Sequence, residues 1–112
     1  MLREIGHEME VLMVTRHHQI DFATGALVFP GGKVNSGDQD VRVHGRCSGI
    51  GGLSNHDVAL RVAAIREAFE ESGLLLARHR GAMRLIDASQ ATELGPRYRQ
   101  RLDSGEIGIA DM

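Results

Sequence analysis

Residues 66–73 read REAFEESG, which places Glu67, Glu70 and Glu71 together and follows them at once with a glycine. If this stretch is the last turn of a helix, the three glutamates lie at the negative end of the helix dipole. Spacings of three and four residues also bring their like charges together on the helix surface. The stretch is therefore unfavourable for stability alone, and it indicates a functional site.

The sequence around this stretch predicts a helix that begins at Ser54 and ends near Ser72. Ser54 stands three residues before Asp57, which is typical of a capping box. Gly73 suits the left-handed position that ends many helices. Four apolar residues fall on one stripe and are expected to face the core, whereas the glutamates fall roughly opposite and are expected to face outward. The four are Val58, Val62, Ile65 and Phe69.

The glutamate cluster has two interpretations. It can be a solvated acidic face that Arg66 partly neutralises, which is the more common explanation for three acids on a helix. It can also bind a divalent cation, because such an ion needs several converging carboxylate oxygens and one helix face supplies them at this spacing. The upstream stretch FPGG (29–32) favours the metal site, since two glycines let the backbone approach a metal or a phosphate closely.

The rest of the chain predicts two strands, a long loop and a second helix. Strands are expected in the apolar stretches 9–16 and 25–32, and a helix is expected around 89–103. Residues 33–56 are rich in glycine and polar side chains, so we interpret them as a long loop that is mobile compared with the helix that follows. No sheet strand is expected after Gly73.

Composition indicates one domain without a large surface of a single charge. The chain has 112 residues, of which 42% are hydrophobic and 25% charged, and its formal net charge is -2. This near-neutral balance and the low aromatic content (4%) argue against a nucleic-acid partner. No apolar stretch is long enough for a signal peptide or a membrane span, and the single cysteine cannot form an internal disulfide. A cytoplasmic protein without a membrane partner is the expectation.

Three further features of the sequence do not indicate a functional site. The stretch GIGG (49–52) lacks the Lys-Ser/Thr pair of a phosphate-binding loop, so a flexible loop is expected. Cys47 has no catalytic partner at a motif spacing, and an inert thiol is expected. Three arginines of the second helix, Arg97, Arg99 and Arg101, are expected to form a solvated flank.

The stretch REAFEESGL (66–74) resembles the second half of the Nudix box, G-x5-E-x7-R-E-U-x-E-E-x-G-U, in which U is an aliphatic residue. Every fixed position of this half is met. The first half resembles the box at Gly32, with Asp38 at the position that is usually glutamate. Between Asp38 and Arg66 lie 27 residues, 39–65, instead of seven. An insertion at about 35–56 therefore splits the box.

A finer resemblance is to the branch of coenzyme A and acyl-coenzyme A diphosphatases, whose signature is L-L-T-x-R-(S/A)-x3-R-x3-G-x3-F-P-G-G. Leu12, Arg16, Gly25 and the FPGG stretch stand at the corresponding spacing. Asp21, however, stands where the signature has its second arginine. This exchange would weaken attraction for a phosphorylated coenzyme, so the identity of the substrate stays open.

The resemblance implies an α/β fold, the α/β/α sandwich around a mixed sheet. We expect a single Nudix domain over residues 1–112 that is incomplete, with its C-terminal strands missing. The implied activity is metal-dependent hydrolysis of the diphosphate linkage in a small nucleoside-diphosphate-linked compound, with coenzyme A or acyl-coenzyme A as leading substrates and Mg²⁺ or Mn²⁺ as cofactor. The alternative is a non-catalytic binding or assembly module, or an inactive fragment, whose exposed sheet edge pairs with another chain, for example in a homodimer.

The resemblance also implies roles for individual residues. Glu67, Glu70 and Arg66 form the expected catalytic set, in which Arg66 orients a neighbouring carboxylate through a charged hydrogen bond. Which glutamate acts as general base stays open. The expected metal ligands are Glu67, Glu70, Glu71 and the carbonyl of Gly31, or alternatively that of Gly32. The expected substrate contacts are Arg16, Gly31, Gly32 and Lys33.

Overall fold

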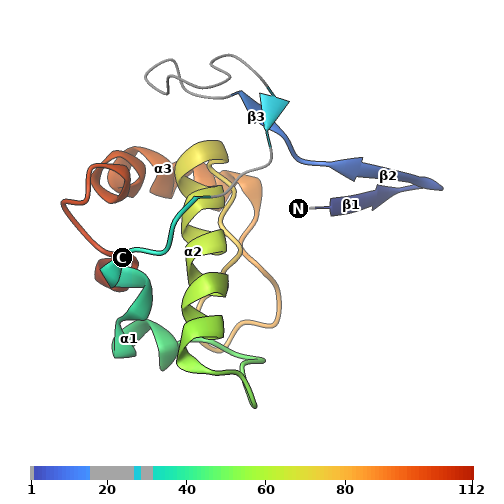
Figure 1. The fold of residues 1–112 in the computed structure, drawn as a ribbon. Helices are drawn as coiled ribbons and strands as arrows, with labels where there is room; N and C mark the ends of the chain where they lie inside the picture. Colours follow the sequence, from blue (N-terminus) through green and yellow to red (C-terminus); the bar gives the residue numbers. More distant parts are fainter. Residues whose placement is uncertain (1, 16–26, 29–31) are drawn as a thin grey trace. The chain divides into compact units, whose positions relative to one another are not determined.

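The computed structural model describes residues 2–15, 27–28 and 32–112 (Figure 1). The chain divides into two compact units, Met1–Pro30 and Gly31–Met112. Among the described residues, the first unit contains short strands, and the second contains helices and 3-10 turns. The coarse α/β class expected from the sequence is therefore confirmed.

A short antiparallel hairpin opens the first unit. β1 (Leu2–Ile5) pairs with β2 (Glu8–Val11) in a register that sets Leu2 opposite Val11. Gly6, in the connection, has a φ of 61°, a left-handed value that glycine adopts without steric cost. The sequence analysis predicts no strand before residue 9, and β1 corrects it. Its four residues, LREI, are too short a pattern to distinguish a strand from a loop.

A second antiparallel pair completes the described part of this unit. β3 (Val14–Thr15) pairs with β4 (Leu27–Val28). With β2, these elements confirm strands within the stretches 9–16 and 25–32, although each strand is shorter than its stretch. The two pairs form separate two-stranded sheets. Residues 32–112, all of them described, contain no strand, in agreement with the expectation for the region after the glutamates.

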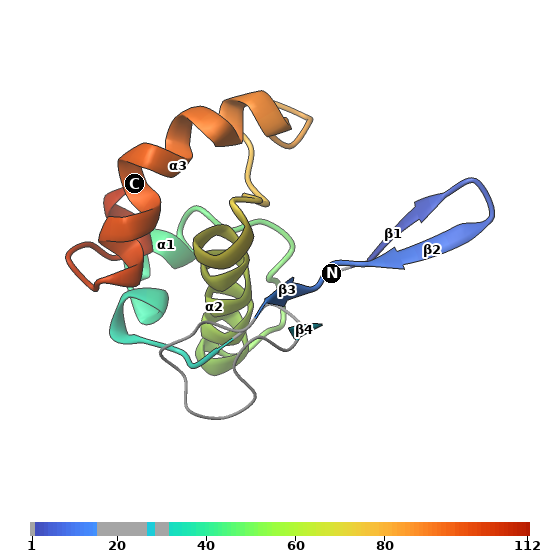
Figure 2. The same cartoon turned by 90° about the horizontal axis from the view of Figure 1, so that it is seen from above.

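Helix α2 (Asn55–Ser72) is the central element of the second unit (Figure 2). It begins where the sequence predicts, because the hydroxyl of Ser54 accepts a hydrogen bond from the backbone N–H of Asp57 at 3.1 Å. It ends at Gly73, whose φ of 78° places it in the left-handed region. Both ends of the predicted helix are therefore confirmed.

The core of the second unit lies along α2. Three of the four predicted core residues are buried, with Phe69 completely covered, whereas Ile65 is only half-buried. Several residues outside the predicted stripe are buried as well, because other segments of the unit pack around more than one face of the helix. These additional buried residues are Ala59, Ala63, Arg66 and Ala68.

The segment interpreted as a long loop is partly folded, which corrects the sequence analysis. It contains a 3-10 turn, η1 (Ser36–Gln39), and a short helix, α1 (Val41–His44). Val43 is buried in a cluster with Ala110 and two valines of α2. Partly buried side chains of the same segment pack against this cluster, namely Cys47, Ile50 and Leu53. The order comes from these tertiary contacts, which leave no periodic pattern in the sequence.

Helix α3 (Ala88–Asp103) packs against α2 and confirms the predicted second helix. Pro96 lies inside it and removes one backbone donor, and α3 is curved in Figure 2. A 3-10 turn, η2 (Ile109–Asp111), follows and contacts both η1 and α1. Of the helices in the described residues, none combines the length and the apolar character that a membrane crossing requires.

Amide hydrogen exchange tests the predicted mobility of the insertion. We expect amides of residues 49–52 to exchange more than about a hundredfold faster than those of residues 58–69, because exposed loops open at almost no free-energy cost whereas core helices do not. Gly49 and Gly52 have positive φ values and are exposed, which suits a turn without a hydrogen-bonded ladder. Exchange resolved by NMR measures both segments in one sample. Equal protection throughout both segments would contradict the prediction.

Candidate active site

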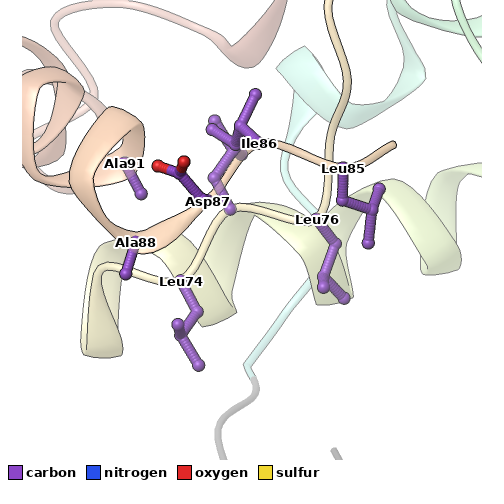
Figure 3. Close-up of a pocket in the computed structure, with 8 residues that line it drawn as sticks. Leu74, Leu76, Leu85, Ile86, Asp87, Ala88 and Ala91 are labelled. Atoms are coloured by element: carbon purple, nitrogen blue, oxygen red, sulfur yellow. The ribbon is translucent and has the colours of Figure 1, made fainter. Parts of the chain in front are cut away.

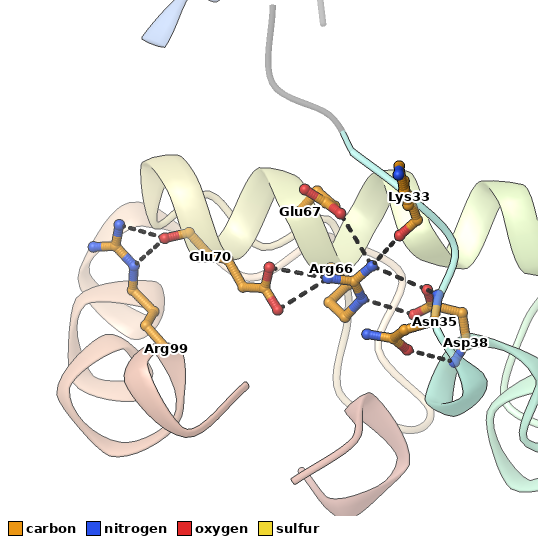
Figure 4. A network of polar contacts seen from close by, with 7 residues as sticks. All are labelled: Lys33, Asn35, Asp38, Arg66, Glu67, Glu70 and Arg99. Atoms are coloured by element: carbon orange, nitrogen blue, oxygen red, sulfur yellow. Dashed lines mark hydrogen bonds and ion pairs between the residues drawn. The ribbon is translucent and has the colours of Figure 1, made fainter. Parts of the chain in front are cut away.

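Arg66 occupies the centre of a buried network of carboxylates beside α2 (Figure 4). Its side chain is only 5% exposed. The guanidinium donates to both oxygens of Asp38, through Nε at 2.8 Å and through Nη2 at 3.0 Å. Asp38 itself is completely buried. This bidentate ion pair is among the strong forms of the charged hydrogen bond, and it fixes the orientation of both side chains.

The remaining donors of Arg66 reach the other groups of the network. Nη1 donates to both carboxylate oxygens of Glu70, at 3.1 and 3.0 Å. Nη2 also donates to Oε1 of Glu67 at 3.1 Å and to the carbonyl of Lys33 at 3.0 Å. Arg66 thus forms the charged hydrogen bonds to neighbouring carboxylates that the sequence analysis expects.

Two of the three glutamates do not face solvent, which corrects the expectation of an outward acidic face. The side chains of Glu67 and Glu70 are 13% and 6% exposed. Glu71 is exposed. Gly32 lies against the Glu67 carboxylate and Arg66 binds both carboxylates, and the periodicity of α2 could not reveal these contacts. A fully solvated acidic face is therefore excluded for Glu67 and Glu70.

The insertion folds so that Asp38 forms an ion pair with Arg66, although 27 residues, 39–65, separate the two in sequence. A capping box at η1 fixes Asp38: the backbone N–H of Asn35 donates to the Asp38 carboxylate, and the backbone N–H of Asp38 donates to the Asn35 side chain. A ring nitrogen of His44 also bonds the carbonyl of Asp38 at 3.1 Å. The sequence analysis missed Asn35, although the N-x-x-D pattern at 35–38 was the signal that could have identified it.

Gly32 lies directly against the Glu67 carboxylate. A β-carbon added at Gly32 would overlap both carboxylate oxygens, so only glycine fits without displacing that side chain. Gly32 thus lets the backbone lie against the acidic cluster. Lys33 contributes its carbonyl to the network, and its residue is exposed. The other predicted contacts, Arg16 and Gly31, lie outside the described residues, as do Asp21 and Gly25.

The network carries more negative than positive charge. Three carboxylates surround one guanidinium, which leaves a formal excess of two negative charges. Burial raises the pKa of the Glu70 carboxyl, and the Arg66 guanidinium opposes this shift. Burial disfavours the charged form of Arg66, but its hydrogen bonds to Asp38 and Glu70 outweigh that effect and raise its pKa. A divalent cation would neutralise the excess charge.

The donor set fits a divalent cation in charge but does not form a complete ligand shell. Among the side chains of the described residues, no three acidic, histidine or cysteine groups converge on a point where a metal ion would bind. Glu70 directs both oxygens at Arg66, whereas Glu67 directs only Oε1 at it. Glu67, beside Gly32, therefore keeps one carboxylate oxygen that Arg66 does not bind.

A separate apolar hollow of about 100 Å³ lies between the segment after α2 and the start of α3 (Figure 3). Its lining contains one charged residue, Asp87, which caps α3 through a hydrogen bond from the backbone N–H of Gln90. No member of the Arg66 network lines it. The hollow therefore lacks the groups that diphosphate chemistry requires. The side chains that line it include Leu74, Leu76, Leu85 and Ile86.

The described residues bring the acidic helix, Gly32 and Asp38 together around Arg66. In a comparison with curated proteins the chain is distantly similar to a Nudix hydrolase, which confirms the resemblance to that family. The relative is the acyl-coenzyme A diphosphatase NUDT19 of Xenopus laevis, which is 33% identical over 97 residues, covering 62% of this chain and 26% of the relative.

The extent of this similarity is limited. The chain spans about a quarter of the length of the curated relative that it matches. No protein-family model matches the chain. No solved structure matches it either.

Proposed function

We propose that this chain carries the catalytic helix of a metal-dependent Nudix hydrolase, which cleaves a diphosphate linkage and releases two phosphorylated products. One observation carries the proposal: the insertion folds so that Asp38 meets Arg66, which reunites the two halves of the split box around Glu67 and Glu70. The α/β/α sandwich with a mixed sheet is part of the same proposal.

The proposed cofactor is Mg²⁺ or Mn²⁺, which when bound polarises phosphoryl oxygens and lowers the pKa of bound water. The proposed ligands are Glu67, Glu70, Glu71 and the carbonyl of Gly31. Of the glutamates, Glu70 is the proposed general base, and burial raises the pKa of its carboxyl. Arg66 holds the Glu70 carboxylate through both oxygens and so fixes its orientation.

Coenzyme A or an acyl-coenzyme A is the proposed substrate. The printed name of the relative supports this substrate class, and so does the spacing of Arg16 and Gly25 before FPGG. We assign substrate contacts to Arg16, Gly31, Gly32 and Lys33. Among these, Lys33 is exposed and forms no ion pair with another described residue, so its ammonium group is available to a phosphate.

Titration with Mn²⁺ tests the proposal on the full chain. Replacing Glu67 by glutamine is expected to weaken Mn²⁺ binding at least about tenfold, because loss of even an outer-sphere partner of a metal commonly costs that much. Glu71→Gln is expected to act in the same direction. Electron paramagnetic resonance of free Mn²⁺ measures the affinity, and hydrolysis of acetyl-coenzyme A in the same samples measures activity.

Glu93→Gln is the matched control for this titration, because Glu93 is an exposed glutamate of α3 outside the network. Its affinity for Mn²⁺ is expected to equal that of the unchanged chain. Mn²⁺ affinity equal to that of the unchanged chain in both the Glu67 and the Glu71 variant, or no Mn²⁺ binding by the unchanged chain, would remove the metal-site proposal.

A non-catalytic assembly module is the second candidate, and one observation favours it. All eight residues of β1 and β2 are exposed, so this hairpin offers faces and edges to another chain. Such a module needs no metal ion. The Mn²⁺ titration therefore separates the two candidates.

A further inference from the structure

Arg99 of α3 reaches across to the last turn of α2. Its guanidinium donates to the backbone carbonyl of Glu70 through Nε at 3.2 Å and through Nη2 at 2.8 Å (Figure 4). The expectation of a solvated flank is therefore wrong for Arg99. It holds for Arg97, which is exposed and lies over the ring of Tyr98.

The carbonyl of Glu70 needs such a partner because of where α2 ends. The last four carbonyls of a helix have no N–H group four residues ahead within the helix. In α2, the carbonyl of Phe69 accepts from the N–H of Gly73 at 2.9 Å. The N–H that would serve Glu70 belongs to Leu74, and it donates instead to the hydroxyl of Ser72. Arg99 supplies the missing donor.

Arg99 also offsets the electrostatic cost of this turn. The turn carries Glu70 and Glu71 at the negative end of the helix dipole, where a cation is favourable. The guanidinium lies close to the helix end itself, because a β-carbon added at Gly73 would come within 3.4 Å of Nη1 of Arg99. Two arginines thus act on Glu70 from opposite parts of the residue: Arg66 binds its carboxylate, and Arg99 binds its carbonyl.

We propose that Arg99 is a positioning residue that fixes the last turn of α2, which carries Glu70 and Glu71, two of the metal ligands proposed above. The effect of Arg99 on metal binding rests on the function proposed above. The fixing of the turn by Arg99 is independent of that function. Arg99 acts through Glu70 and contacts neither metal nor substrate.

The experiment compares Arg99→Gln with the unchanged full chain. Amide exchange of residues 70–73 is expected to accelerate at least about tenfold, because a hydrogen bond from a charged donor is lost. Exchange of residues 58–66 is expected to stay unchanged. Mn²⁺ affinity is expected to fall by roughly ten- to a hundredfold, the usual effect of losing a group that orients metal ligands. Arg99→Lys is expected to recover part of both losses, since it restores the charge and one donor.

Two controls separate positioning from a general loss of stability. Arg97→Gln removes an exposed arginine of the same helix, which lies over the ring of Tyr98, so it is expected to change neither measurement. Ala91→Gly lowers helix stability by about 0.5–1 kcal/mol at a buried site of α3. It is expected to leave Mn²⁺ affinity intact, whereas a purely structural role for Arg99 would make the two variants behave alike.

Each outcome decides a specific statement. Unchanged exchange of residues 70–73 in Arg99→Gln overturns the positioning of the turn. Faster exchange with unchanged Mn²⁺ affinity overturns the link between this turn and the metal. If the unchanged chain binds no Mn²⁺, the proposed function fails, and the exchange measurement alone decides whether Arg99 fixes the turn.

Discussion

Replacing Arg66 by methionine is expected to lower the free energy of unfolding of the second unit by about 3–5 kcal/mol. The substitution keeps an unbranched side chain of similar length but removes the cation between Asp38 and Glu70. Asp38 is completely buried and the Glu70 side chain is 6% exposed, so both carboxylates would be left buried without a charge partner. Urea denaturation followed by circular dichroism measures the loss.

Arg61→Met is the matched control for this prediction. Arg61 lies five residues earlier on the same helix and is exposed, so its loss is expected to change stability by less than about 0.5 kcal/mol. The double variant Arg66→Met, Asp38→Leu is expected to lose less than the sum of its single variants, because residues that share one ion pair are not additive. A loss below 1 kcal/mol in Arg66→Met would contradict a buried network.

Replacing Phe69 by alanine is expected to cost a similar amount, about 3–5 kcal/mol, because a large side chain leaves a cavity in a close-packed core. Phe69 is completely buried on the side of α2 away from solvent. Leu60→Ala is the control, since Leu60 lies on the same helix but is 47% exposed. Thermal unfolding of both variants measures the difference, and equal losses would show that Phe69 is not part of a packed core.

The boundaries of α2 could be predicted because local chemistry sets them. Ser54 supplies the hydrogen bond that starts the helix, and Gly73 supplies the left-handed residue that ends it. Neither depends on a distant part of the chain. The Nudix resemblance was likewise carried by the contiguous stretch 66–74.

The surroundings of the glutamates could not be predicted in the same way. Gly32 lies against Glu67, Asp38 shares Arg66 with the glutamates, and α3 reaches the carbonyl of Glu70. All three are distant in sequence from the glutamates. The periodicity of a single helix reports which residues share a face, but it does not report what covers that face. The same reason explains the error for the insertion, whose order rests on Val43 packing against α2 and Ala110.

The capping box at η1 makes the position of Asp38 largely independent of the length of the insertion. Asn35 fixes Asp38 locally, and Val43 anchors the chain just beyond it, whereas Gly49, Gly51 and Gly52 are exposed. Doubling the length of a flexible loop costs only about 0.6 kcal/mol in closure entropy. Residues added or removed at these glycines would therefore leave the acid that meets Arg66 in place. Two parts of the chain that are far apart in sequence would stay neighbours in the folded structure.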